Sequence, residues 1–464
     1  MAGSGTAHLR PADQTLLHAE HLVVEFPVGR SGLKVNAVSD VSLDILEGET
    51  LGLVGESGCG KSTTARAMIQ LPPPTSGSVV FEGQDLTKLK GETLRRVRPR
   101  MQMIFQDPIS SLNPRRKIGD LVTEGLEIWG IGAQQPQRRA WTTTAAAVMS
   151  FILAGMSFLA AMLFLAQPLR SFSLVALIVY VLFSLLSAAM GAWFIRLGVA
   201  LLAREPWARF ASIVSSVLGL LVAWPLGIAL GLLMFTRPTR DRDFRRTEYQ
   251  KRADDVLDAV GLDPEQARGR RPHEFSGGQC QRISIARAVI TEPKLILCDE
   301  PVSALDVSVQ AQILNLLQEM KARFGLTLVF IAHDLAVVKN VSDRVAVMYL
   351  GKICEVAQPD ELYEHPVHPY TAALLAAIPE PDPEVRPSER DALSGEIPSP
   401  VSPPSGCRFR TRCPKAQQKC AEEEPVIEEV RPGHFAACHF PLAEGEELDF
   451  TARTDAVAPA PAAG

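Results

Sequence analysis

The chain has 464 residues, of which 21% are charged, and its formal net charge at pH 7 is −5. This length predicts two to four folded units, and the slightly negative charge gives no sign of affinity for nucleic acid, so we expect no nucleic-acid partner. Residues 1–15 and 452–464 are small, polar or Pro/Ala-rich, which predicts disordered ends.

A strand and a phosphate-binding loop are predicted near the N-terminus. Apolar residues alternate through Leu22–Phe26, which indicates a half-buried strand with Phe26 in the core. The apolar run Leu51–Val54 then leads into a glycine-rich turn and a helix that begins at Lys61. Glycines let backbone N–H groups face phosphate oxygens, and the helix N-terminus adds the positive end of its dipole. The predicted nucleotide-binding residues of this loop are Gly55, Glu56, Ser57, Gly58, Cys59, Gly60, Lys61, Ser62 and Thr63.

Two residues of the loop have specific expected roles. Lys61 is expected to reach the β- and γ-phosphates, and the Ser62 hydroxyl to ligate Mg²⁺. The alternative is a structural strand-to-helix turn that binds no nucleotide.

Three long apolar stretches follow, and each exceeds the roughly 18–20 residues needed to cross a bilayer. They are Thr144–Ala166, Phe172–Ala203 and Ala211–Phe235. Arginines flank both outer ends, which places both ends in the cytoplasm and requires an even number of crossings. Four passes, or two with a re-entrant hairpin, meet that requirement. We therefore predict a transmembrane insertion at residues 140–246, inside an otherwise continuous polar helical region.

Two motifs in the second half of the chain suit phosphate chemistry. Ser276 and its glycines open a predicted helix, whose N-terminus is an anion site, although a plain Ser N-cap is the alternative. The apolar run from Leu295 ends in two carboxylates, as expected of a buried parallel strand. Asp299 is expected to hold Mg²⁺ through water, and Glu300 to polarise the attacking water. Solvated acids at a strand end are the alternative interpretation.

The eight cysteines form two groups. Cys59, Cys280, Cys298 and Cys354 are scattered and need only be small buried residues. Cys407, Cys413, Cys420 and Cys438 follow the Pro-rich stretch Pro379–Pro404 with the spacing C-x₅-C-x₆-C-x₁₇-C. Four thiols in one irregular segment of a cytoplasmic protein suggest a metal or cluster site, with zinc and metal-free thiols as alternatives.

Taken together, the motifs resemble the nucleotide-binding subunits of ABC transporters. The signature residues are Ser276, Gly277, Gly278 and Gln279; Gln106 fits the Q-loop, Ser303 and Asp306 the D-loop, and His333 the switch histidine. This resemblance implies an ATP sandwich of two subunits, in which the signature serves the partner's nucleotide. It also implies adenine stacking for Phe26, Mg²⁺ binding by Ser62, Gln106 and Asp299, and catalytic roles for Glu300, His333, Gln106 and Lys61.

The surrounding sequence narrows the resemblance to di- and oligopeptide importers. Phe105–Pro108, Met348–Lys352 and Glu364–Thr371 match that group, and the resemblance spans about residues 18–135 and 247–440. It implies a second ATPase subunit, two permease subunits, an extracytoplasmic peptide-binding protein, and a tail whose cysteines hold a [4Fe–4S] cluster. Import of another small solute, such as nickel, is an alternative.

The predicted fold class is an α/β phosphate-loop cassette with a helical subdomain, interrupted by an all-α transmembrane insertion and followed by a small cysteine-rich tail. The predicted location is the cytoplasmic side of the cell membrane, with transmembrane segments of its own. The predicted divisions are a disordered N-terminus (1–15), the cassette in two parts (16–139 and 247–378), the insertion (140–246), a linker (379–404), the tail (405–442) and a disordered C-terminus (443–464). A fused exporter, and a membrane-anchored chimera or sensor with an impaired cassette, are the rival interpretations.

Overall fold

The computed structural model describes residues 5–29, 32–131, 237–378, 396–446 and 448–450, together with Arg196. The chain divides into two compact units. The first comprises residues 1–131 and 252–464, and the second comprises residues 132–251. All of the sheets and all of the predicted nucleotide motifs belong to the first unit.

An eight-stranded sheet forms the centre of this unit, in the order β11-β12-β10-β9-β3-β8-β7-β6. Its middle strands β9, β3, β8, β7 and β6 run parallel, and nearly all of their residues are buried, as expected for a sheet covered on both faces. Parallel strands bring their carboxyl ends to one edge, where α/β folds bind ligands. These strands are β3 (Thr50–Val54), β6 (Met101–Ile104), β7 (Leu295–Asp299), β8 (Thr327–Ile331) and β9 (Arg344–Tyr349).

A second, antiparallel sheet has the order β2-β1-β4-β5. Helix α1 (Lys61–Met68) contacts strands of both sheets, and one apolar core contains residues from both. The predicted strands at Leu22–Phe26 and Leu51–Val54 and the predicted helix at Lys61 are therefore confirmed. The strands of the second sheet are β1 (Leu17–Pro27), β2 (Lys34–Ile45), β4 (Ser76–Phe81) and β5 (Gln84–Asp85).

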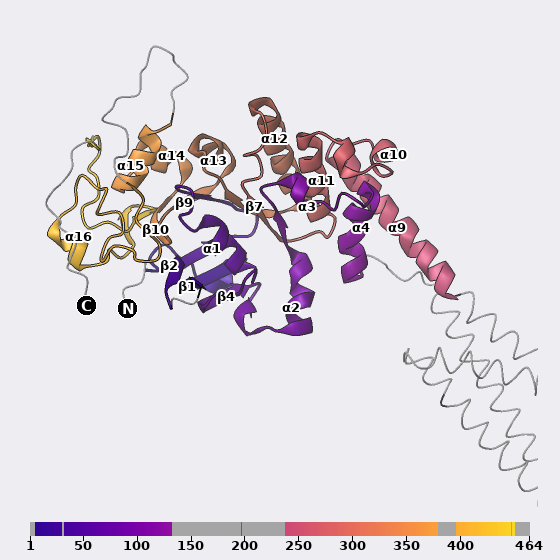
Figure 1. Cartoon of the computed structure of the whole chain (residues 1–464), viewed down its shortest axis with the longest axis horizontal. Coiled ribbons are helices and arrows are strands. Elements are labelled where there is room, and N and C mark those ends of the chain that lie inside the picture. Colours follow the sequence, from indigo (N-terminus) through magenta and orange to yellow (C-terminus); the bar gives the residue numbers. More distant parts are fainter. Residues whose placement is uncertain are drawn as a thin grey trace, which may run out of the picture. The chain divides into compact units, whose positions relative to one another are not determined.

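A helical region lies along the chain between β6 and β7. Helix α11 contacts α3, α4 and α12, so it is the centre of this region (Figure 1). Its helices are α3 (Pro108–Ser111), α4 (Ile118–Trp129), α9 (Arg237–Ala259), α10 (Pro264–Ala267) and α11 (Gly277–Val289). The remaining helices of the cassette are α2 (Gly91–Val97), α12 (Val307–Phe324), α13 (Leu335–Val341), α14 (Pro359–Glu364) and α15 (Pro369–Ala376). Short 3₁₀ helices are Ala12–Gln14, Leu86–Lys88, Arg98–Arg100 and Pro272–Glu274.

The cysteine-rich tail extends the central sheet. Strand β12 (His434–Ala436) pairs antiparallel with β10 (Lys352–Ala357), and β11 (Glu428–Arg431) pairs with β12. In Figure 1 the tail, with the short helix α16 (Gln418–Glu422), lies beside β10. The tail thus shares hydrogen bonds with the cassette.

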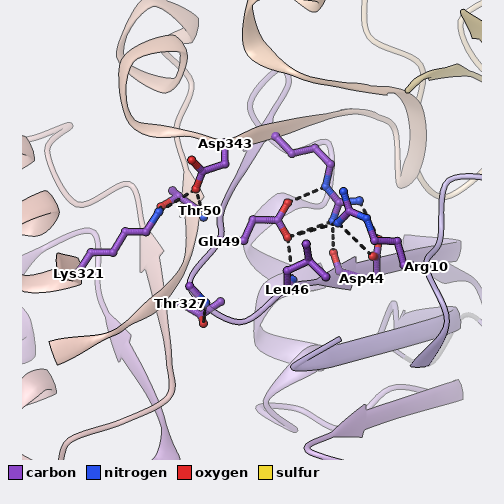
Figure 2. Close-up of polar contacts among 10 residues, drawn as sticks. Arg10, Asp44, Leu46, Glu49, Thr50, Lys321, Thr327 and Asp343 are labelled. Carbon is purple, nitrogen blue, oxygen red and sulfur yellow. Dashed lines mark hydrogen bonds and ion pairs between the residues drawn. The ribbon is translucent and has the colours of Figure 1, made fainter. Parts of the chain in front are cut away.

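The N-terminal segment, predicted to be disordered, also packs on the cassette. His8 is buried, and its Nε2 lies 2.8 Å from the carbonyl oxygen of Ser42. Arg10 adds to a buried charge network around Asp44 of β2 and Glu49 (Figure 2), in which Arg344 of β9 donates to both acids. This network joins the two sheets next to the start of β3.

The transmembrane part of the predicted fold class is wrong. Among the residues that the structure describes, no helix is both long enough and apolar enough to cross a bilayer. Helix α9 begins at Arg237, inside the predicted insertion, continues without a break past its expected end at Arg246, and is rich in Arg and Asp. The stretches Thr144–Ala166, Phe172–Ala203 (apart from Arg196) and Ala211–Phe235 lie outside the described residues. The transmembrane segments expected for the chain's location are corrected for the same reason.

Candidate active site

The glycine-rich loop joins the carboxyl end of β3 to the N-terminus of α1. Gly55, Gly58 and Gly60 have φ angles of 144°, 76° and 105°, a region that side chains rarely adopt. A Cβ atom on Gly55 would lie 2.1 Å from the Met348 carbonyl oxygen, and one on Gly60 would lie 2.3 Å from that of Ala37. Only glycine fits at these two positions, so the conformation of the loop requires glycine at both.

Lys61 is buried at the start of α1, and its side chain folds over the loop. Its Nζ donates hydrogen bonds to the carbonyl oxygens of Gly55 at 2.8 Å and Glu56 at 3.0 Å. Cys59, beside it, is buried, and burial raises the pKa of its thiol. The ammonium group is therefore held inside the curve of the loop, where it can meet the β- and γ-phosphates of a nucleotide.

Ser62 and Asp299 meet although they lie 237 residues apart in the chain. The Ser62 hydroxyl donates to the Asp299 carboxylate at 2.5 Å, and Arg66 donates to the other carboxylate oxygen at 2.9 Å. Sequence reasoning missed Arg66, although its position one turn after Ser62 on α1 placed it on the same helix face. The parallel sheet brings β3 and β7 to one edge and so unites the two halves of this site.

The chemistry of Ser62 and Asp299 fits Mg²⁺. Both offer oxygen, the ligand that Mg²⁺ prefers, and Mg²⁺ is usually held by one or two carboxylates together with substrate phosphates and water. The Asp299 side chain is only 3% exposed, so its charge is poorly screened by solvent. Gln106, predicted as a third Mg²⁺ ligand, donates to Glu300, and its role at the metal stays a prediction.

Three of the four predicted catalytic residues, Glu300, Gln106 and His333, lie together. Gln106 Nε2 donates to the Glu300 carboxylate at 2.7 Å, and His333 Nδ1 lies 3.8 Å from the same oxygen. The backbone of Glu300 has a φ of 47°, and its N–H donates to the Ile331 carbonyl oxygen. Ser303 of the predicted D-loop donates its hydroxyl to the Glu300 carbonyl oxygen at 3.1 Å. The segments that follow β6 and β8 thus contact this carboxylate, while Ile331 and Ser303 hold the Glu300 backbone at the edge of the sheet.

The predicted signature forms the N-terminus of α11. The Ser276 hydroxyl accepts from the Gln279 N–H, and the Gln279 side chain accepts from the Ser276 N–H, so the two residues form a capping box. A Cβ atom on Gly278 would lie 2.6 Å from Val309, in the first turn of α12. Asp306 caps α12, and hydrogen bonds from Val309 and Ser308 lower its pKa. The signature glycines therefore allow α11 to pack closely on α12.

Phe26 lies near the end of β1 with 40% of its surface exposed. The interpretation of Phe26 as a core residue is therefore wrong. An exposed aromatic ring is available for stacking on a base, which stays a prediction.

The four cysteines of the tail converge on one pocket. Cys407, Cys413, Cys420 and Cys438 all line it, beside His368 and Phe409. Burial raises the pKa of Cys407 and Cys413 to about 12 and that of Cys438 to about 11. Within the described residues, however, no three His, Cys, Asp or Glu side chains are arranged to hold a metal ion. The other four cysteines, predicted to be buried, are buried.

Several residues at the loop were not predicted from the sequence. Tyr370 and Arg412 both bond to Glu56, from 314 and 356 residues farther along the chain. No local pattern marks either one.

Two family models match the chain. The model for "ABC transporter" matches residues 38–174 and 194–303, and the model for "Oligopeptide/dipeptide transporter, C-terminal region" matches residues 354–420. The chain is 39% identical to a putative peptide import ATP-binding protein of Brucella ovis over 91% of its own length and 97% of the relative's. It is 41% identical to the oligopeptide transport ATP-binding protein OppF of Salmonella typhimurium over 85% of each chain.

Among solved structures, a dimeric ATP-binding cassette in a post-hydrolysis state with ADP and Pi matches with a TM-score of 0.46 and 20% identity. The match covers 74% of this chain and 98% of that one.

Proposed function

The chain belongs to the ABC transporter family, among the ATP-binding proteins of oligopeptide and dipeptide import, and on this premise we propose that it hydrolyses ATP to energise peptide import through separate permease subunits. One observation carries the proposal: two hydrogen bonds join residues that are far apart in the chain. Ser62 bonds to Asp299, 237 residues away, and Gln106 bonds to Glu300, 194 residues away. A phosphate loop, a carboxylate for the metal and a carboxylate for water thus lie at one sheet edge. Import of nickel or another small solute is the alternative.

The phosphate loop binds the polyphosphate of ATP. Backbone N–H groups of the loop and the N-terminus of α1 face the phosphates, and Lys61 neutralises charge that develops on the γ-phosphate. Ser62 and Asp299 are the side chains that would hold Mg²⁺. When bound, that ion neutralises negative charge on the β- and γ-phosphates.

Glu300 positions the attacking water. Its carboxylate accepts from Gln106 and lies beside His333, so these two side chains orient it and respond to the γ-phosphate. Water attacks the γ-phosphorus, its proton passes toward the Glu300 carboxylate, and the bond from the γ-phosphorus to the β–γ bridging oxygen breaks to release ADP. In this assignment, catalysis depends on the position of the attacking water and on the charges that surround the γ-phosphate.

The signature acts on a nucleotide held by a second ATPase subunit. Ser276 opens α11, and a helix N-terminus stabilises negative charge presented from across an interface. The proposed assembly contains two ATPase subunits, two permease subunits and an extracytoplasmic peptide-binding protein, with the ATPase on the cytoplasmic side of the membrane. The proposed cassette comprises residues 16–139 and 247–378, linked through residues 379–404 to the tail.

A structural metal centre in the tail is a second part of the proposal, with a [4Fe–4S] cluster ahead of zinc. What supports it is the convergence of Cys407, Cys413, Cys420 and Cys438 on one pocket. Since these thiols lack a ligand arrangement in the described structure, no step of ATP hydrolysis is assigned to a metal there. Absorption near 400 nm with stoichiometric iron in anaerobically purified protein would support a cluster. Metal-free protein with full activity would contradict the centre.

ATP hydrolysis by the full-length chain, beside Glu300→Gln and Glu292→Gln, tests the central proposal. Glu292 is a matched control because its side chain is 69% exposed and pairs with Arg252 away from the loop. We expect Glu300→Gln to bind ATP but to lose about 10²–10³-fold in turnover. The control should keep full activity. Rapid hydrolysis by Glu300→Gln would refute the assignment of the water-positioning residue.

Peptide-stimulated hydrolysis, measured after reconstitution with the permease and binding subunits, distinguishes the substrates. Stimulation by nickel or another solute, but not by peptides, would select the alternative. Iron-dependent behaviour without ATPase activity would favour a sensor.

A further inference from the structure

The phosphate loop is held from outside the nucleotide motifs by the C-terminal tail. Arg412 Nη1 donates to Glu56 Oε2 at 2.7 Å, and Arg412 Nη2 donates to Glu56 Oε1 at 3.0 Å. This bidentate pair has the geometry of the strongest ion pairs between side chains. Glu56 is the second residue of the loop. The tail therefore contacts the loop where phosphates are expected to bind.

The Arg412 side chain is buried at this position. It is only 4% exposed, and its guanidinium lies over the ring of Tyr349 and donates to the Tyr349 hydroxyl. Tyr349 itself packs against Tyr370 and Phe409 with ring centroids 4.7 and 5.2 Å away. Burial disfavours the charged guanidinium, but its hydrogen bonds to Glu56 and Tyr349 outweigh burial and raise the pKa of Arg412. Arg412 therefore keeps its charge in this buried position.

The backbone of the loop is tied to the same region. The Glu56 N–H donates to the Tyr370 hydroxyl at 2.8 Å, and the Glu56 carbonyl oxygen accepts from Lys61. Farther along the loop, the Cys59 carbonyl oxygen accepts from the Gly351 N–H at 2.7 Å. Arg408 of the tail donates to the Leu350 carbonyl oxygen next to Gly351. Glu56 and Cys59 of the turn thus both bond to elements that the tail contacts.

A carboxylate in a phosphate loop opposes the loop's function unless its charge is neutralised. The phosphates of ATP are negatively charged and are expected to bind the loop that contains Glu56, and like charges placed close together repel. Arg412 supplies the compensating charge and turns the carboxylate toward the tail. It also fixes the residue whose carbonyl oxygen orients the Lys61 ammonium.

We propose that Arg412 is a positioning residue of the ATP site, which makes the cysteine-rich tail a cis-acting part of nucleotide binding. This inference rests on the proposed function, because it concerns affinity for ATP. Arg412 immediately precedes Cys413 and lies between it and Cys407, two of the four cysteines that line the tail pocket.

Nucleotide affinity in the full-length chain tests the inference. The Kd for ATP is measured by calorimetry in a Glu300→Gln background, which prevents turnover, for Arg412→Ala, Arg412→Lys and the control Arg410→Ala. Arg410 is a matched control because it is also buried in the tail but bonds to Ser405 within it. KM and kcat are measured for the same variants with Glu300 intact.

We expect Arg412→Ala to raise the Kd and KM for ATP roughly ten-fold, with kcat at saturating ATP changed less than about two-fold. Arg412→Lys, which keeps the charge but loses the bidentate geometry, should raise the Kd roughly two- to three-fold. Adding Glu56→Gln to Arg412→Ala should restore most of the affinity, because it removes the uncompensated charge. If Arg412→Ala does not fold, the Kd for ATP of Arg412→Lys and of Glu56→Gln is compared with that of the parent chain.

The outcomes separate this inference from the proposed function. No ATP binding by the parent chain would overturn the proposed function and the inference together. ATP binding by the parent with an equal Kd in the Arg412 variants and in Arg410→Ala would overturn the inference alone. An unchanged Kd with a reduced kcat would also overturn it, since that result assigns Arg412 to a later step.

Discussion

Replacing Arg344 with Met tests the buried charge network that joins the two sheets. Arg344 donates to Glu49 Oε1 and to Asp44 Oδ1, each at 2.9 Å, and both acids are buried, with the Asp44 side chain 0% exposed. Without Arg344, the one cation that pairs with these acids among the described residues is Arg10, at 3.7 and 3.9 Å (Figure 2). The Arg10 side chain is 40% exposed. Removing one partner of a buried pair leaves uncompensated charge and costs about 3–5 kcal/mol.

Replacing Lys321 with Met is the control. Lys321 pairs with Asp343 at 2.7 Å (Figure 2). The Asp343 side chain is 58% exposed, so Lys321→Met should cost about 1 kcal/mol or less. Urea unfolding of the full-length chain, followed by fluorescence with a shared slope, gives both values. Adding Asp44→Asn to Arg344→Met should recover part of the loss. Equal losses for Arg344→Met and Lys321→Met would refute the reasoning.

Other parts of the site and fold lead to further expectations. Ser62→Ala should weaken Mg²⁺-dependent ATP binding more than metal-free binding, as measured by calorimetry with and without chelator; equal weakening would contradict the metal role. Gly60→Ala should cost about 1–3 kcal/mol in unfolding free energy, because its φ of 105° and the Ala37 carbonyl oxygen leave no room for a Cβ; an unchanged urea midpoint would contradict this. Burial lowers the pKa of His368 from 6.5 to about 4, so the unfolded chain binds a proton that the folded chain excludes, and stability should fall as the pH falls from 6.5 toward 4. Unfolding midpoints across that range should depend less on pH in His368→Asn, and an unchanged slope would contradict the assignment.

Most of the candidate active site could be predicted from the sequence. Glycine at Gly55 and Gly60, and the carboxylates that end β7, follow from local backbone geometry and from the way parallel strands present their carboxyl ends. The contacts of Ser62 with Asp299 and of Gln106 with Glu300 agree with these expectations.

Boundaries along the chain followed less closely from local sequence. The tail, predicted to follow a Pro-rich linker, adds strand β12 to β10 of the central sheet. The boundary predicted at Arg246 falls inside the continuous helix α9. Composition and periodicity report on local preference, whereas these boundaries depend on which segments share hydrogen bonds.

The sequence by itself determined the order of the motifs, the loop that only glycine can form, and the strand-end acids, because each depends on backbone geometry over a few neighbouring residues. Only the tertiary structure decided that Phe26 is exposed and that Arg412 and Tyr370 hold Glu56. Those contacts join residues more than three hundred positions apart. They exist because the tail adds strands to the edge of the central sheet, and no local pattern carries that pairing.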